Sequence, residues 1–241
     1  MLLKTKGVVF HNIKYADKKI ISKIYTRDHG MQSYMVNVGS SAKSKIKPAL
    51  LLPLNQLEME VFSKENKDLG RISEARCFYQ YSGLGTDLQK SSIGAFLNEV
   101  LYRSIVEEES NPNLFDFIVH TLQWLDVTHE PVSNFHLYFM AELSKHLGFY
   151  PQNNYSAGEH TFDMVEGSFI SYTPSHPNFL DKQQAKDFSG LFYLTLQNLN
   201  DFKVSKEQRI YLLNNLIRYY KLHVAGLKEI KSLAVLQATF N

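Results

Sequence analysis

The sequence predicts an α+β chain in two parts: a small β-barrel over residues 1–80 and an all-α domain over residues 81–241. Three observations lead to this prediction. The first part contains about five short segments that are β-branched or alternate between apolar and polar side chains. From about residue 88 the apolar residues recur with a helical period instead. The first part also holds 14 of the 26 Lys and Arg residues but only 7 of the 24 Asp and Glu residues.

The expected strands follow one another at short intervals. Asp28-His29-Gly30 is a turn signal between two of them, because glycine adopts a positive φ without strain. The segments are residues 7–13, 20–26, 31–38, 57–62 and 71–81. Five short strands in so few residues are typical of a small barrel, and the five-stranded oligonucleotide-binding barrel (OB-fold) is one such fold.

The helical part is predicted from apolar stripes spaced at three and four residues, which amphipathic helices need in order to pack. Five stripes begin at Ile93, Leu114, Phe135, Phe188 and Ile210, and a short sixth helix is expected near residues 231–236. Residues 151–182 interrupt this pattern with Asn, Gly, Ser, Thr and three prolines. We therefore expect an irregular insert at about 151–182 within the helical domain.

The sequence offers no recognisable catalytic constellation. It lacks the motifs of zinc proteases, serine hydrolases, dithiol sites and P-loops, so we expect no enzyme activity and no nucleotide cofactor. Glu159, His160, Asp163 and His176 could ligate a metal, but their spacing is loose and a solvated loop is the favoured interpretation. The lone Cys77 and the absence of a leader-like or membrane-spanning segment predict a cytoplasmic protein with no membrane contact.

The basic residues of the first part predict contact with a polyanion, since Lys and Arg neutralise phosphates and release counterions. Aromatic residues such as Phe10, Tyr15, Tyr25 or Tyr34 could stack on bases, although strand aromatics more often belong to a core. A barrel that binds a protein partner remains the alternative. The predicted DNA contacts are Lys4, Lys6, Lys18, Lys19, Lys23, Arg27, Lys43, Lys45 and Lys47, the last three in an exposed loop.

Several stretches together resemble the RecO family of bacterial recombination mediators. In the first part these are Lys4 to Val9, Tyr15 to Ile21, Thr26 to Gly30, the basic loop Ala42 to Lys47, and Leu50 to Leu54. In the second part they are Phe96 to Leu101, Leu143 to Phe149, and Leu216 to Tyr220 followed by Lys231 to Leu233. Each motif is weak alone, but their order and spacing span nearly the whole chain.

The resemblance implies an N-terminal OB-fold, binding of single-stranded and double-stranded DNA, and annealing of complementary strands at the nucleoid. It also implies loading of recombinase onto strands coated by single-strand binding protein, with RecR and the acidic C-terminal tail of single-strand binding protein as partners. An apolar slot with a nearby cation would suit such a tail. The candidates for it are Tyr138, Leu216, Arg218 and Lys221.

The sequence departs from the family at one point. Many members carry a four-cysteine zinc site in the insert, whereas residues 150–179 contain no cysteine here. Tetrahedral zinc needs four suitable ligands, so the sequence predicts that the zinc site is lost. Aromatic residues such as Phe162, Phe169 and Tyr172 are then expected to hold the insert together.

Overall fold

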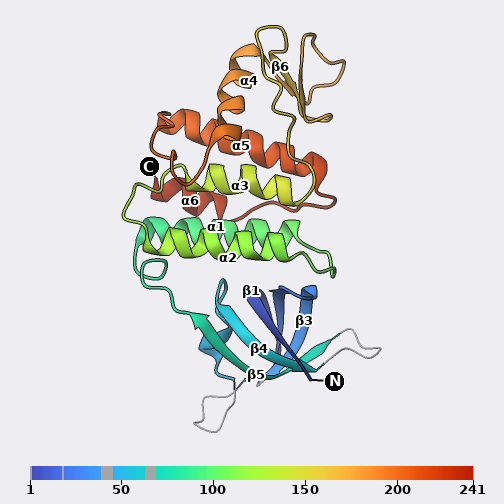
Figure 1. Cartoon of the computed structure of the whole chain (residues 1–241), viewed down its shortest axis with the longest axis vertical. Coiled ribbons are helices and arrows are strands. Elements are labelled where there is room, and N and C mark those ends of the chain that lie inside the picture. Colours follow the sequence, from blue (N-terminus) through green and yellow to red (C-terminus); the bar gives the residue numbers. More distant parts are fainter. Residues whose placement is uncertain (1, 18, 39–45, 63–68, 241) are drawn as a thin grey trace. The chain divides into compact units, whose positions relative to one another are not determined.

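The protein is described from a computed structural model that covers residues 2–17, 19–38, 46–62 and 69–240. The chain forms two compact units, Met1–Val127 and Thr128–Asn241. The first unit contains a barrel and two helices, and the second contains the remaining helices and a small sheet (Figure 1). The predicted division after residue 80 marks the change from strand to helix, but the two helices that follow pack with the barrel as one unit.

The barrel consists of β1 (Leu2–Ala16), β2 (Lys19–Thr26), β3 (Gly30–Asn37), β4 (Gln56–Phe62) and β5 (Gly70–Tyr79). It closes in the order β1-β2-β3-β5-β4. β1 is long enough to pair with β4 through its first half and with β2 through its second half. Closure comes from a short parallel contact in which Tyr34 pairs with Gly70 and Met35 with Arg71. The predicted five-stranded OB-fold is therefore confirmed.

Alternation along the strands fills the barrel, since successive strand residues point to opposite faces. The interior is apolar and its side chains are at most 4% exposed: Val9, Ile24, Tyr34, Val36, Ile46, Leu51, Leu57, Met59 and Val61. Burial of this apolar area is the main force that holds the barrel closed.

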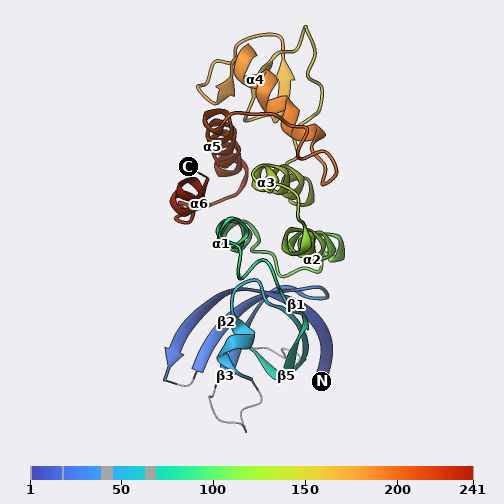
Figure 2. The ribbon, with the colours of Figure 1, turned by 90° about the vertical axis from the view of Figure 1, so that its left-hand side faces the viewer.

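Helices α1 (Leu88–Ser104) and α2 (Pro112–Val127) lie beside each other on one side of the barrel (Figure 2). The ring of Tyr25 stacks on Phe10 of β1, with centroids 5.9 Å apart, and contacts Phe115 of α2 at 6.3 Å. Asn98 of α1 donates a hydrogen bond to the Phe10 carbonyl oxygen at 3.0 Å. These contacts attach both helices to the strands.

The second unit is built on α3 (Phe135–His146) and α5 (Lys206–His223). Tyr220 of α5 is fully buried, and its hydroxyl donates to the Met140 carbonyl oxygen of α3 at 2.6 Å. Helix α6 (Leu233–Thr239) is the expected short terminal helix, shifted by a few residues. No helix among the described residues is long and apolar enough to cross a membrane.

The fourth expected helix is displaced. The stripe that begins at Phe188 predicted a helix through Leu199, but α4 spans Lys182–Ser189 and is followed by a 3₁₀ turn, η2 (Gly190–Tyr193). Asp181 begins α4 early with a capping box that includes Gln184. Beyond η2, the Asn198 side chain accepts from Thr195 N–H and donates to the Tyr193 carbonyl, so local side-chain bonds replace the helical ladder.

The predicted irregular insert contains regular structure as well. Three short strands, β6 (Thr161–Asp163), β7 (Ser168–Ile170) and β8 (Phe179–Leu180), form a sheet in the order β7-β6-β8. Phe162 is buried at the centre. Its ring centroid lies 4.8 Å from that of Phe169, 5.0 Å from that of Phe188 and 5.7 Å from that of Tyr219. Tyr172, also expected in this core, is instead 65% exposed.

Candidate nucleic-acid interface

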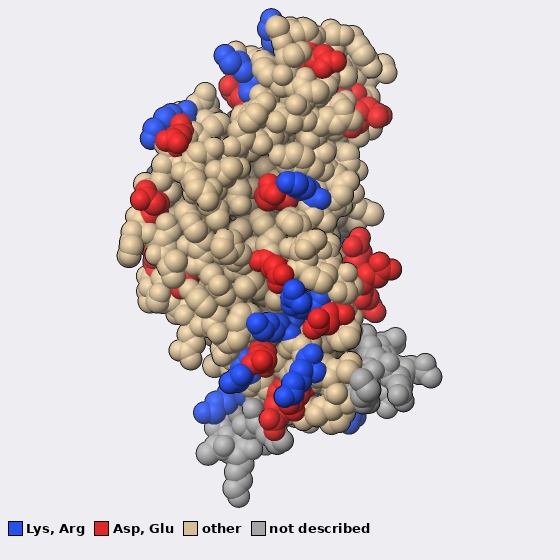
Figure 3. Space-filling view, viewed as in Figure 1, with Lys and Arg blue, Asp and Glu red and all other residues tan. Residues whose placement is uncertain are grey.

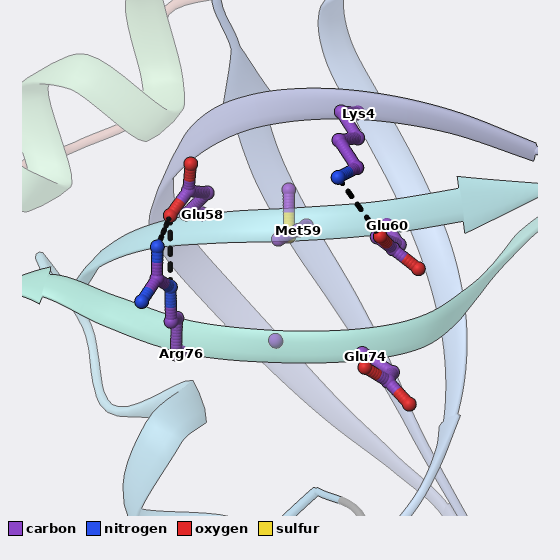
Figure 4. A pocket seen from close by; sticks show the side chains of 7 residues that line it. Lys4, Glu58, Met59, Glu60, Glu74 and Arg76 are labelled. Carbon is purple, nitrogen blue, oxygen red and sulfur yellow. Dashed lines mark hydrogen bonds and ion pairs between the residues drawn. The ribbon is translucent and has the colours of Figure 1, made fainter.

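One outer face of the barrel carries Lys4 and Lys6, but it is electrostatically mixed. The register of β1 and β4 sets Lys4 opposite Glu60 and Lys6 opposite Glu58. Lys4 Nζ lies 3.5 Å from Glu60 Oε1, and Arg76 of β5 binds Glu58 through two guanidinium nitrogens (Figure 4). Lys6 Nζ sits 4.9 Å from the centre of the Phe78 ring. Blue and red side chains are mixed on the barrel face seen in Figure 3, and Lys4 is already paired with a carboxylate there.

A second groove, of about 420 Å³, opens between β2, β3 and β5. Its described lining contains two cations, Lys19 and Arg71, and no carboxylate; the other lining residues are Met35, Asn37, Ile46, Ile72 and Ser73. Strand register explains the grouping, because Lys19 pairs with Asn37 and Met35 pairs with Arg71. Cations set in a polar and apolar trough without competing acids suit a phosphate backbone and the bases attached to it.

The remaining predicted cations are spread around the barrel. Lys47 is exposed and directly follows Ile46, which lines the groove. Lys23 projects from β2 beside α1, where its Nζ lies 5.8 Å from the centre of the Tyr102 ring. Lys18, Lys43 and Lys45 lie outside the described residues. The described part of the barrel thus gathers Lys19 and Arg71 in one groove and leaves Lys4 and Lys6 on another face.

Arg27 has a different environment from the other predicted contacts. Its guanidinium donates two hydrogen bonds of 3.1 Å to the carboxylate of Asp116 on α2, and this pairing lowers the pKa of the Asp116 carboxyl. Gly30, at φ 60°, lets the turn approach the backbone of Glu107 and Glu109 so closely that a Cβ would clash there. The turn from Thr26 to Gly30 therefore fastens the barrel to its helices, and Arg27 stays a predicted DNA contact only in competition with Asp116.

Of the four aromatic candidates for base stacking, three belong to the core. Phe10, Tyr25 and Tyr34 are at most 3% exposed, and burial raises the pKa of the Tyr34 hydroxyl to about 12. Tyr15 is 64% exposed and adjoins Ala16, which pairs with Lys19 of the groove. Tyr15 is thus the one of the four whose ring a base can reach.

The four residues predicted to bind a partner differ in exposure and in contacts. Leu216 is 1% exposed and serves the core of the second unit. Arg218 donates to the Asn178 side chain at 2.9 Å and to the Pro177 carbonyl oxygen, while Lys221 is exposed and Tyr138 half-buried. Leu216 belongs to the apolar stripe of α5, and the packing of that helix buries its side chain.

A small apolar pocket with cations at its rim does exist in the second unit. It is lined by His136, Lys206, Arg209, Ile210, Leu213, Leu236, Gln237 and Phe240. Arg209 is oriented by a 2.9 Å hydrogen bond from its Nε to the Asn134 side chain. Sequence reasoning missed this pocket because it joins the start of α5 to α6, a contact that no local pattern encodes.

The insert holds the residues that the sequence suggested as possible metal ligands. In the part of the chain that the structure describes, no group of three or more His, Cys, Asp or Glu side chains is placed to hold a metal. Two of the candidate ligands contact each other: His176 Nε2 lies 3.3 Å from Asp163 Oδ2, and Asp163 also accepts the N–H groups of Val165 and Glu166. The prediction of a lost zinc site remains to be tested on the protein.

A closed barrel in the order β1-β2-β3-β5-β4 with two attached helices defines an OB-fold protein, a class that binds oligonucleotides and oligosaccharides. Comparison with known proteins makes the relationship specific. Residues 1–81 match the family model described as Recombination protein O N terminal, and residues 85–234 match Recombination protein O C terminal. The chain belongs to the RecO family, whose role is in DNA repair and recombination.

Relatives support this assignment along the whole chain. The chain is 37% identical over 241 residues to the DNA repair protein RecO of Phocaeicola vulgatus and 38% identical over 244 residues to that of Flavobacterium psychrophilum. It is 29% identical over 246 residues to that of Porphyromonas gingivalis. Each alignment covers 100% of both chains. The resemblance inferred from the sequence motifs is confirmed.

Proposed function

We propose that this protein binds single-stranded DNA in the groove between β2, β3 and β5 and promotes annealing of complementary strands. The proposal rests on one observation: Lys19 and Arg71 line the same groove, and its described lining has no carboxylate. Contacts to phosphates leave the base edges accessible. Neutralisation of two strands lowers their mutual repulsion, and Watson–Crick pairing then completes the reaction without a catalytic residue or a cofactor.

Family membership supports a wider proposal. We propose that the protein works in the cytoplasm at the nucleoid, on single-stranded and double-stranded DNA, and helps to load recombinase onto strands coated by single-strand binding protein. RecR is the proposed protein partner. The pocket between α3, α5 and α6 is the proposed seat for the acidic tail of single-strand binding protein, because it combines apolar walls with Lys206 and Arg209.

The groove is tested by fluorescence anisotropy with a labelled single strand across a salt series. The double variant Lys19→Glu, Arg71→Glu should lose at least tenfold in affinity and show a shallower salt slope, since fewer counterions are released. The double variant Lys4→Glu, Lys6→Glu is the matched control, because it makes the same change of four charge units on the mixed face. Equal losses in the two double variants would reject the groove as the binding site.

The alternative function is a protein-interaction scaffold whose barrel binds a protein and not DNA. The specific observation in its favour is the face around Lys4, where Glu58, Glu60, Glu74 and Arg76 present charges of both signs. A DNA affinity that is weak and nearly independent of salt would favour this alternative over the strand-annealing function.

A further inference from the structure

A cluster of three side chains lies where β1 and β2 meet helix α1. His11 of β1 and Lys23 of β2 are register partners and so project from the same face. The His11 imidazole stacks on the Tyr102 ring of α1, with centroids 4.5 Å apart and planes inclined by 25°. Lys23 Nζ lies 5.8 Å from the centre of the same ring. One tyrosine therefore fixes both an imidazole and an ammonium group.

The members of this cluster differ in exposure. Tyr102 and Lys23 are half-buried, whereas His11 is exposed. Partial desolvation of the ring, followed by the charges of Lys23 and Arg103, lowers the pKa of His11. The nearby Arg103 forms an ion pair with Glu99 on the same helix. The result is an aromatic ring that is exposed to solvent, stacked on Tyr102 and adjacent to the ammonium group of Lys23.

The cluster continues the cationic groove along one strand. Lys19 lines the groove, and Lys23 follows it four residues later on β2. An even spacing places both side chains on the same face of the strand, roughly 13 Å apart at about 3.3 Å per residue. A single strand that leaves the groove along β2 would therefore reach Lys23 and His11 without crossing another element of the barrel.

We propose that His11 is a base-stacking position and that Lys23 beside it is a phosphate contact, with Tyr102 as the residue that positions both. Imidazole rings serve as stacking surfaces for unpaired bases, and such stacking tolerates every base because each has a π-face. This inference rests on the proposed binding of single-stranded DNA. It extends the DNA path from the barrel groove onto the junction with α1.

The experiment compares two labelled strands of equal length, an oligothymidylate and the same strand with abasic residues. Both carry the same phosphates, but only the first offers bases to stack. His11→Ala should bind the oligothymidylate about fivefold more weakly and leave the abasic strand unchanged. Lys23→Ala should weaken both strands alike, because its partner is the phosphate.

Tyr102 supplies the positioning test. Tyr102→Phe keeps the ring and should bind as the parent does. Tyr102→Leu should weaken both strands, and the oligothymidylate more than the abasic strand, because it releases Lys23 as well as His11. Melting curves by circular dichroism check the fold, and His11→Ala alone decides the question if Tyr102→Leu unfolds. His129→Ala, an exposed histidine of the second unit, is the matched control.

Equal effects of His11→Ala on the two strands, or no effect on either, would overturn the stacking role. The groove variant Arg71→Glu separates this failure from a failure of the proposed function. If Arg71→Glu loses affinity while His11→Ala does not, only the present inference is rejected. If the parent protein binds neither strand, the proposed function falls as well.

Discussion

The carboxylate of Asp126 accepts the backbone N–H of Leu84 at 2.7 Å and thereby ties the end of α2 to the segment that leaves the barrel. The same carboxylate accepts the N–H groups of Ser82 and Gly83 and the hydroxyl of Tyr79. Burial alone would raise the pKa of Asp126, but these hydrogen bonds hold it below its usual value. One acidic side chain thus orders the connection between strand and helix.

Replacement of this carboxylate should destabilise the first unit. Asp126→Ala leaves buried N–H donors without an acceptor, so we expect a loss of about 3 kcal/mol or more in the free energy of unfolding. Trp124, the single tryptophan, lies in α2, so its fluorescence during urea unfolding reports on this unit. Asp116→Ala on the same helix is the control, since its exposed ion pair contributes little. Equal stability of the two variants would contradict the role given to Asp126.

The basic loop expected from the sequence, Ala42 to Lys47, is the next test. Replacement of Lys43, Lys45 and Lys47 with Glu should abolish single-strand binding at moderate salt, because three cations become three anions beside the phosphate chain. Unfolding monitored through Trp124 should be unchanged. An anisotropy titration that returns the parent affinity would show that the loop plays no part and that the groove residues suffice.

The insert should depend on its aromatic core and not on a metal. Phe162 is fully buried, so Phe162→Ala should cost about 3–5 kcal/mol, whereas Tyr172→Ala at an exposed position should cost little. Thermal melting by circular dichroism measures both. Metal analysis of the purified protein should find no stoichiometric zinc, and a chelator should leave the melting curve unchanged. A melting temperature that falls with the chelator would restore a metal site to this unit.

The sequence predicted the fold well because the fold depends on local patterns. Alternation of apolar and polar residues predicted the strands, which bury one face, and apolar residues spaced three and four apart predicted the helices. The displaced α4 shows the limit of this approach. The apolar stripe is present, but a capping box at Asp181 begins the helix earlier than the stripe predicted, and hydrogen bonds of the Asn198 side chain replace the helix at its expected end. The apolar pattern alone does not show whether side-chain hydrogen bonds or the helical backbone bonds will form.

The candidate site was less predictable, because it depends on pairings between distant segments. Lys19 was expected from its charge, but Arg71 joins it only because β3 and β5 pair in parallel across the barrel closure. Arg27 shows the converse case. Nothing in the sequence around it reveals that Asp116, on a helix far along the chain, binds its guanidinium.

The two candidate surfaces for an acidic tail can be distinguished by charge reversal. Lys206 lines the pocket between α3, α5 and α6, whereas Lys221 belongs to the set expected from the sequence. With a synthetic peptide that carries several Asp residues and an apolar C-terminal residue, Lys206→Glu should weaken binding about tenfold or more, since attraction becomes repulsion. Lys221→Glu should bind as the parent does. The reverse result, read by calorimetry, would move the tail site to the Lys221 surface.

His136 should make the second unit sensitive to acid. Its imidazole is 2% exposed, and burial together with Arg209 lowers its pKa from 6.5 to about 3. The unfolded chain therefore takes up a proton that the folded chain refuses, and the folded state loses stability as the pH falls from about 6.5 towards about 3. The slope in this window approaches about 1.4 kcal/mol per pH unit.

His136→Phe cannot take up that proton, so its unfolding free energy, measured by circular dichroism, should depend less on pH. The exposed control His129→Gln should follow the parent. Parallel pH profiles for the parent and His136→Phe would show that His136 does not set the acid limit of this unit.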